Sequence, residues 1–77
     1  MQVEIISPEA KLFEGEAQSV KVPGADGQFE MLNNHAAIIS TLSAGTIQVK
    51  NDKNVQSFEV KGGVVEMKNN KLIILAD

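Results

Sequence analysis

The chain has 77 residues, which is enough for one hydrophobic core and therefore predicts a single domain over residues 1–77. Its formal net charge is −3 and its seven basic residues are all lysines scattered along the chain, which argues against nucleic-acid binding. The absence of cysteine excludes disulfide bonds, thiolate metal sites and a thiol nucleophile.

Apolar and polar residues alternate with a period of two over most of the chain, which predicts half-buried antiparallel strands. Each alternating segment contributes a pair of apolar residues two positions apart. These pairs, in chain order, are Val3 and Ile5, Val20 and Val22, Ile47 and Val49, Phe58 and Val60, and Val65 and Met67.

Turn-forming residues separate these segments. Asp26-Gly27 and Asn69-Asn70 tolerate the positive φ of tight hairpins, and the polar residues 51–54 form a third hairpin candidate. Gly62-Gly63 interrupts a pair of strands, which indicates a bulge or a close approach of two backbones.

Three segments are harder to assign. Ser7-Pro8-Glu9 resembles a helix start, but no apolar face at helical spacing follows it, so we expect a turn. The segment 36–42 fits a short helix or a strand, and its brevity and adjacent isoleucines favour a strand. Residues 72–75 are all apolar, which is typical of a strand covered on both faces.

Short strands at this spacing predict an all-β sandwich or barrel. The longest apolar runs, residues 36–39 and 72–76, are far shorter than the roughly 20 residues of a membrane-spanning helix. Residues 1–20 lack the pattern of a signal peptide. We therefore expect any membrane association to occur through a partner.

The candidates for catalysis are few. His35 is the only histidine, and with no second histidine or cysteine to join it in a metal site, a structural or contact role is the simpler interpretation. Glu14 and Glu16 would share one face of a strand and resemble a carboxylate pair, but a solvated strand face is the plainer explanation. Asp26 is explained by its turn.

The glycine-rich residues 23–27 could suggest a phosphate-binding loop. No Lys-Ser or Lys-Thr follows them and they open no helix, so this interpretation is disfavoured. The longer segment 23–42 instead suggests a partner-binding loop, because apolar Phe29, Met31 and Leu32 lie among polar residues. From the residues alone, these side chains could equally pack into the domain's own core.

Three stretches of the chain carry a family resemblance. Residues 22–37 read Val-Pro-Gly-Ala-Asp-Gly-Gln-Phe-Glu-Met-Leu-Asn-Asn-His-Ala-Ala. The opening has Val-Glu-Ile-Ile-Ser-Pro-Glu at 3–9 and Leu-Phe-Glu-Gly-Glu at 12–16, and the close has Gly-Gly-Val-Val-Glu-Met at 62–67 and Leu-Ile-Ile-Leu-Ala-Asp at 72–77. Together, and in this order, they resemble the N-terminal domain of the epsilon subunit of F-type ATP synthases.

The resemblance implies a flattened antiparallel β-sandwich of about ten short strands with no cofactor. It implies a non-catalytic rotor subunit that couples the gamma subunit to the c-ring, on the cytoplasmic face of a bacterial inner membrane within the F1 sector. Carried over by position, the residues expected to face the polar loops of the c-ring are Gln28, Phe29, Glu30, Met31 and His35. Those expected to face gamma are Ser7, Ile38, Ile39, Ser40 and Leu42.

This sequence departs from the family pattern at several positions. Gln28 stands where Glu is frequent, Glu30 where Gly is frequent, and Asn33 and Ala37 where Pro is frequent. A positive φ at position 30 would cost Glu about 1 kcal/mol. The helical pair that usually follows the sandwich is not in these residues, so neither ATP binding nor inhibition of hydrolysis is assigned.

Two other functions remain as alternatives. The first is a β-sandwich adaptor for a different complex, which would share only the scaffold. The second is a small hydrolase that uses His35 with Glu14 or Glu16.

Overall fold

The computed structural model describes all 77 residues and contains nine β-strands and no helix. The strands are short, of five to seven residues each. Their bounds are β1 Gln2–Ile6, β2 Lys11–Glu16, β3 Ser19–Gly24, β4 Gly27–Leu32, β5 Ile38–Leu42, β6 Gly45–Asn51, β7 Asn54–Val60, β8 Gly63–Lys68 and β9 Lys71–Ala76.

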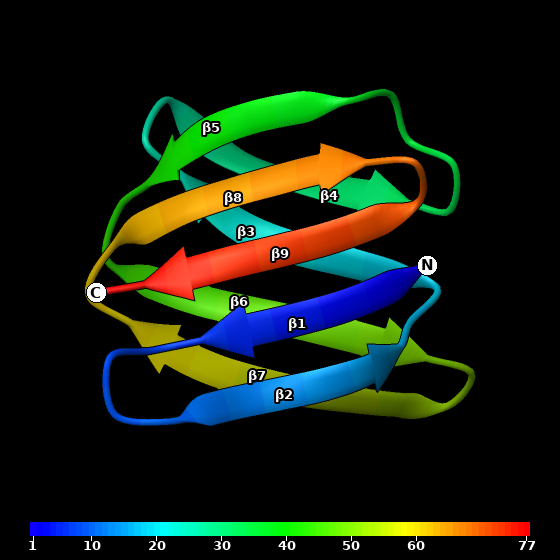
Figure 1. Cartoon of the computed structure of the whole chain (residues 1–77), viewed down its shortest axis with the longest axis horizontal. Helices are drawn as coiled ribbons and strands as arrows, with labels where there is room; N and C mark the ends of the chain where they lie inside the picture. Colours follow the sequence, from blue (N-terminus) through cyan, green and yellow to red (C-terminus); the bar gives the residue numbers. More distant parts are fainter.

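The strands form two stacked layers (Figure 1). The front sheet has the order β2-β1-β9-β8-β5, and the rear sheet has the order β4-β3-β6-β7. A single pairing, Gly24 with Leu42, joins β3 to β5 and links the two sheets along one side. Every pairing is antiparallel except that of β1 with β9. The all-β sandwich expected from the sequence is therefore confirmed, with nine strands in place of about ten.

The core lies between the two sheets and is made almost entirely of aliphatic side chains. One face of each strand points inward, as the period-two alternation predicts, and the predicted pairs Val3/Ile5, Val20/Val22, Ile47/Val49 and Val65/Met67 are all buried. Along the open side, Phe13 of β2 and Phe58 of β7 meet edge to face, with ring centroids 6.0 Å apart. This aromatic contact closes the core where no strand pairing joins the sheets.

The predicted hairpins are confirmed, although the β3–β4 turn is centred on Ala25 and Asp26, and Gly27, which has the positive φ, begins β4. The β8–β9 hairpin turns at Asn69 and Asn70, both with positive φ, as two-residue turns of this hand require. Hairpins also join β3 to β4 and β6 to β7. Ser7 begins a turn rather than a helix, because its backbone N–H donates to the carbonyl of Ala10 at 2.8 Å.

Gly62 and Gly63 lie where the chain passes close to the C-terminal strand. Both have positive φ, of 150° and 145°. A Cβ on Gly63 would overlap the carbonyl oxygen of Leu75. The close backbone approach expected here is confirmed, and it requires glycine for lack of space as well as for φ.

Two sequence predictions were wrong in detail. Residues 72–75 are not covered on both faces, because Leu72 and Ile74 are fully buried whereas Leu75 exposes 55% of its surface. Residues 28–31 form part of strand β4 rather than a loop tip, and Glu30 pairs with Lys21 without a positive φ. Residues 38–42 form a strand, as predicted.

Candidate docking surfaces

The outward face of the front sheet carries an apolar patch made of Ile39, Val64, Ile73 and Leu75. Strand register brings these residues together, because Val64 pairs with Leu75 while Ile39 and Ile73 flank Glu66 on either side. Ile39, Leu75 and Val64 expose 72%, 55% and 42% of their surface. A contiguous exposed apolar patch is a candidate surface for binding another molecule.

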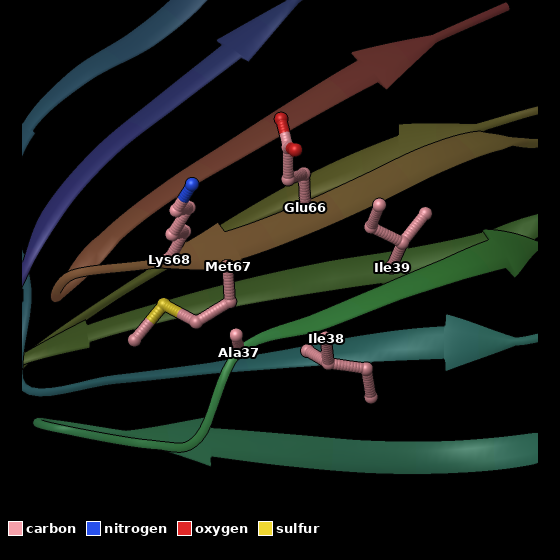
Figure 2. Close-up of a pocket in the computed structure, with 6 residues that line it drawn as sticks. All are labelled: Ala37, Ile38, Ile39, Glu66, Met67 and Lys68. Atoms are coloured by element: carbon pink, nitrogen blue, oxygen red, sulfur yellow. The ribbon is translucent and has the colours of Figure 1, made fainter.

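Glu66 lies within this apolar patch. A hollow is lined by the four apolar side chains and Glu66. A second hollow extends it over the edge of β5, where Figure 2 shows Glu66, Lys68 and Ile39 projecting from one side of the sheet and Met67 and Ile38 from the other. A third hollow is lined by Glu66, Lys68, Asn69, Lys71 and Ile73. The outer surface is therefore apolar on one side of this carboxylate and polar on the other.

The opposite edge of the same face is charged and internally paired. Lys11 Nζ lies 3.2 Å from a carboxylate oxygen of Glu4 and 3.1 Å from one of Glu14, and Lys71 Nζ lies 3.9 Å from a carboxylate oxygen of Glu4. Hydrogen bonds to Glu14 and then to Glu4 raise the pKa of Lys11 above its ordinary value of 10.5. These carboxylates already have partners within the chain.

The outward face of the rear sheet is polar. Glu30 on β4 forms an ion pair with Lys50 on β6 at 3.7 Å, and the hydroxyl of Thr46 donates a hydrogen bond to Glu59. Its exposed apolar residues, Leu32 and Val55, lie on the two opposite edge strands, β4 and β7. The rear sheet thus has no contiguous apolar patch.

The residues expected to face gamma all belong to the front sheet or its adjoining turn. Ile39 lies in the apolar patch, whereas Ile38 is partly buried against the core and Leu42 is 4% exposed. Ser40 pairs with the core residue Val65 and so shares its inward face. Ser7 follows β1, whose last residue pairs with Leu75 of the apolar patch.

The residues expected to face the c-ring belong to the rear sheet and the turn after it. Gln28 and Glu30 are exposed on β4, and His35 lies half-buried in the following turn. Phe29 packs against the core and Met31 is fully buried, so the side chain of Met31 cannot contact a partner in this fold.

The candidates for catalysis are not brought together. The backbone N–H of His35 donates to the carbonyl of Leu32, and its Nδ1 lies 2.7 Å from the carbonyl oxygen of Ala36. Glu14 and Glu16 do share one exposed face of β2, but Glu14 pairs with Lys11 and Glu16 lies 3.7 Å from the N-terminal amine. No group of three or more His, Cys, Asp or Glu residues could hold a metal ion.

Sequence reasoning missed most of the apolar patch. Val64, Ile73 and Leu75 are each adjacent to a residue of the core, and a continuous apolar run hides which members point outward. The alternation of Val65 and Met67 already placed Val64 and Glu66 on the opposite face of β8. By the same rule, the inward direction of Met31 places the neighbouring Leu32 on the outer face, where it is 60% exposed.

The fold and these surfaces define a small two-layered β-sandwich with an apolar patch on one outer face and a polar opposite face. Its sequence matches, over residues 1–77, the family model for the β-sandwich domain of the ATP synthase delta/epsilon chain. The chain therefore belongs to this family, which confirms the resemblance drawn from the sequence.

Curated relatives support the same assignment. The chain is 39% identical over 77 residues to an ATP synthase epsilon chain of Leptospira borgpetersenii, and 40% identical over 78 residues to that of Sulfurimonas denitrificans. It is covered completely in both comparisons but spans only 61% and 60% of the relatives. With an epsilon chain of Chlorobium limicola it shares 35% identity, and there the matched region spans 88% of the relative.

Solved structures show the same fold at low sequence identity. A chain in the mitochondrial ATP synthase of Euglena gracilis matches 96% of this chain with a TM-score of 0.89 at 13% identity. A chain in the central stalk and c-ring structure from Tetrahymena thermophila matches 97% with a TM-score of 0.78 at 20% identity. The matched regions are 48% and 61% of those chains. The structure of the present chain holds no helix with the length and apolar character needed to span a bilayer.

Proposed function

We propose that this chain is a non-catalytic rotor subunit of a proton-translocating F-type ATP synthase, coupling the gamma subunit to the c-ring. Its family membership and the names of its relatives support this assignment. In this role it would be peripheral on the cytoplasmic face of a bacterial inner membrane, held there by the F1 sector and its rotor partners.

The apolar patch is the observation that carries the proposal, because it is the surface best suited to a lasting dock with gamma. Ile39 lies within it, and Ser7 and the rest of β5 lie along its border. A stable interface buries about 800 Å² on each partner, against a total accessible surface of 4548 Å² for this chain. Much of the front sheet would therefore be covered by gamma.

The polar surface around β4 suits the second contact. Gln28 and Glu30 on the strand, with His35 in the turn after it, offer hydrogen-bonding groups to the polar loops of the c-ring. Leu32 adds one exposed apolar side chain beside them. Gamma would then bind the front sheet of the sandwich, and the c-ring would bind the rear sheet.

Transmission of rotation needs a body that does not deform between its two contacts. The aliphatic core between the sheets suits this role, because closely packed interiors have low compressibility and transmit strain. Torque would pass through the sandwich as a unit, with no bond made or broken by its side chains.

The proposal is tested by measuring the affinity of the chain for the gamma subunit of its own synthase. Ile39→Glu places a charge within the apolar patch and should weaken binding at least about a hundredfold, because docking would bury that charge without a partner. Since Ile39 is exposed in the isolated chain, the thermal midpoint should change little.

Val55→Glu is the matched control, since it introduces the same charge at an exposed apolar position of the rear sheet. It should leave the affinity for gamma within about twofold. No binding of the unaltered chain to gamma, or equal losses from both variants, would reject the proposed docking face.

A further inference from the structure

Glu66 differs from Glu4 and Glu14 of the front sheet because it has no partner within the chain. Glu4 and Glu14 form ion pairs with lysines, but Glu66 makes neither an ion pair nor a side-chain hydrogen bond. Its neighbours across the two adjoining strands are the apolar residues Ile39 and Ile73. It is an unpaired carboxylate that lines the apolar hollow on one side and, on the other, a polar hollow with Lys68 and Lys71.

A partner that covers the apolar patch must also cover Glu66. Desolvating a carboxylate without a compensating charge or hydrogen bonds is strongly unfavourable and would offset much of the gain from burying the surrounding side chains. The partner must therefore supply a cation or hydrogen-bond donors at this point, and a cation compensates the charge most fully.

Building on the docking face proposed above, we propose that Glu66 is a specificity-determining residue that pairs with a lysine or arginine of gamma. The aliphatic stem of that side chain packs against Ile39 and Ile73, while its charged end meets the Glu66 carboxylate. A partner with an apolar or acidic side chain at this position is rejected, because it leaves the carboxylate buried and unpaired.

Two cations within the chain, Lys68 and Lys71, line a hollow together with Glu66 and could compete for this role. Lys68 projects from the same side of β8 as Glu66, two residues along the strand (Figure 2), and Lys71 pairs with Lys68 on β9. Neither lysine forms an ion pair with Glu66, Lys71 lies 3.9 Å from Glu4, and neither lines the apolar hollow. If either lysine turned toward Glu66 on docking, the partner would need no cation, and Glu66→Gln would not weaken the salt dependence of binding.

The test compares Glu66→Gln with the unaltered chain by isothermal titration against purified gamma at low and high salt. The substitution keeps the size of the side chain and removes its charge, so a cation on gamma loses its partner while still being buried. We expect the dissociation constant at low salt to rise at least about tenfold and its salt dependence to weaken.

Glu59→Gln on the rear sheet removes the same charge away from the patch and should leave binding within about twofold. An affinity for gamma that is unchanged or improved in Glu66→Gln, or an unchanged salt dependence, would overturn the inference. The proposed function would stand in that case, since the unaltered chain would still bind gamma. Failure of the unaltered chain to bind would instead reject the docking proposal itself.

Discussion

Gly63 lies at a close backbone contact between β8 and β9. Its φ of 145° and the overlap that any Cβ would make with the Leu75 carbonyl oxygen leave no room for a side chain. The Gly-Gly pair in the sequence was enough to predict a special backbone position here. Which backbone it approaches depended on the register of the C-terminal strand.

Gly63→Ala should therefore destabilise the domain by about 3 kcal/mol, because it combines an unfavourable φ with a clash against backbone. Urea denaturation followed by circular dichroism measures this loss. Gly15→Ala is the control, since its added Cβ would meet only the Phe13 ring at 3.5 Å, and it should change stability by less than about 1 kcal/mol. Similar effects from both substitutions would contradict this account of Gly63.

The strands β8 and β9 show what alternation can and cannot predict. On β8, Val65 and Met67 alternate with polar residues, so their inward direction was readable from the sequence. On β9, the run Leu72–Leu75 has no polar residue to mark the outward face. Whether the outer face of β9 is covered depends on what packs against the front sheet, and no strand of this chain packs against it.

Adjacent residues of β9 should therefore respond very differently to truncation. Ile74→Ala removes a fully buried side chain and should cost about 3 kcal/mol, whereas Leu75→Ala should cost less than about 1 kcal/mol in the isolated chain. Chemical denaturation of both variants measures the difference. Equal losses would mean that β9 is covered on both faces in solution.

Strand β4 shows the same effect of alternation among the residues expected to face the c-ring. Phe29 and Met31 alternate with Gln28 and Glu30, so the period of two extends into a segment whose apolar residues among polar ones suggest a partner-binding loop. The family resemblance marked these positions for partner contact, but a strand presents only every second side chain outward. The contact role stays a prediction for Gln28, Glu30 and His35.

At the scale of the whole molecule, the two outer faces differ in character. The front sheet presents the apolar patch, and the rear sheet presents polar and charged residues with two separated apolar ones. Composition could not have shown this asymmetry, because it arises from how register groups residues that are far apart in the sequence. The asymmetry is consistent with a domain that binds a partner mainly through its front sheet.

We propose that gamma covers the front sheet in the assembled synthase. Because the chain has no cysteine, one introduced by Ile39→Cys provides its only thiol for a short cross-linker applied to native membranes. We expect a cross-linked product from Ile39→Cys that mass spectrometry identifies as this chain joined to gamma, and none from Val55→Cys on the rear sheet. A product with gamma from Val55→Cys but not from Ile39→Cys would contradict it.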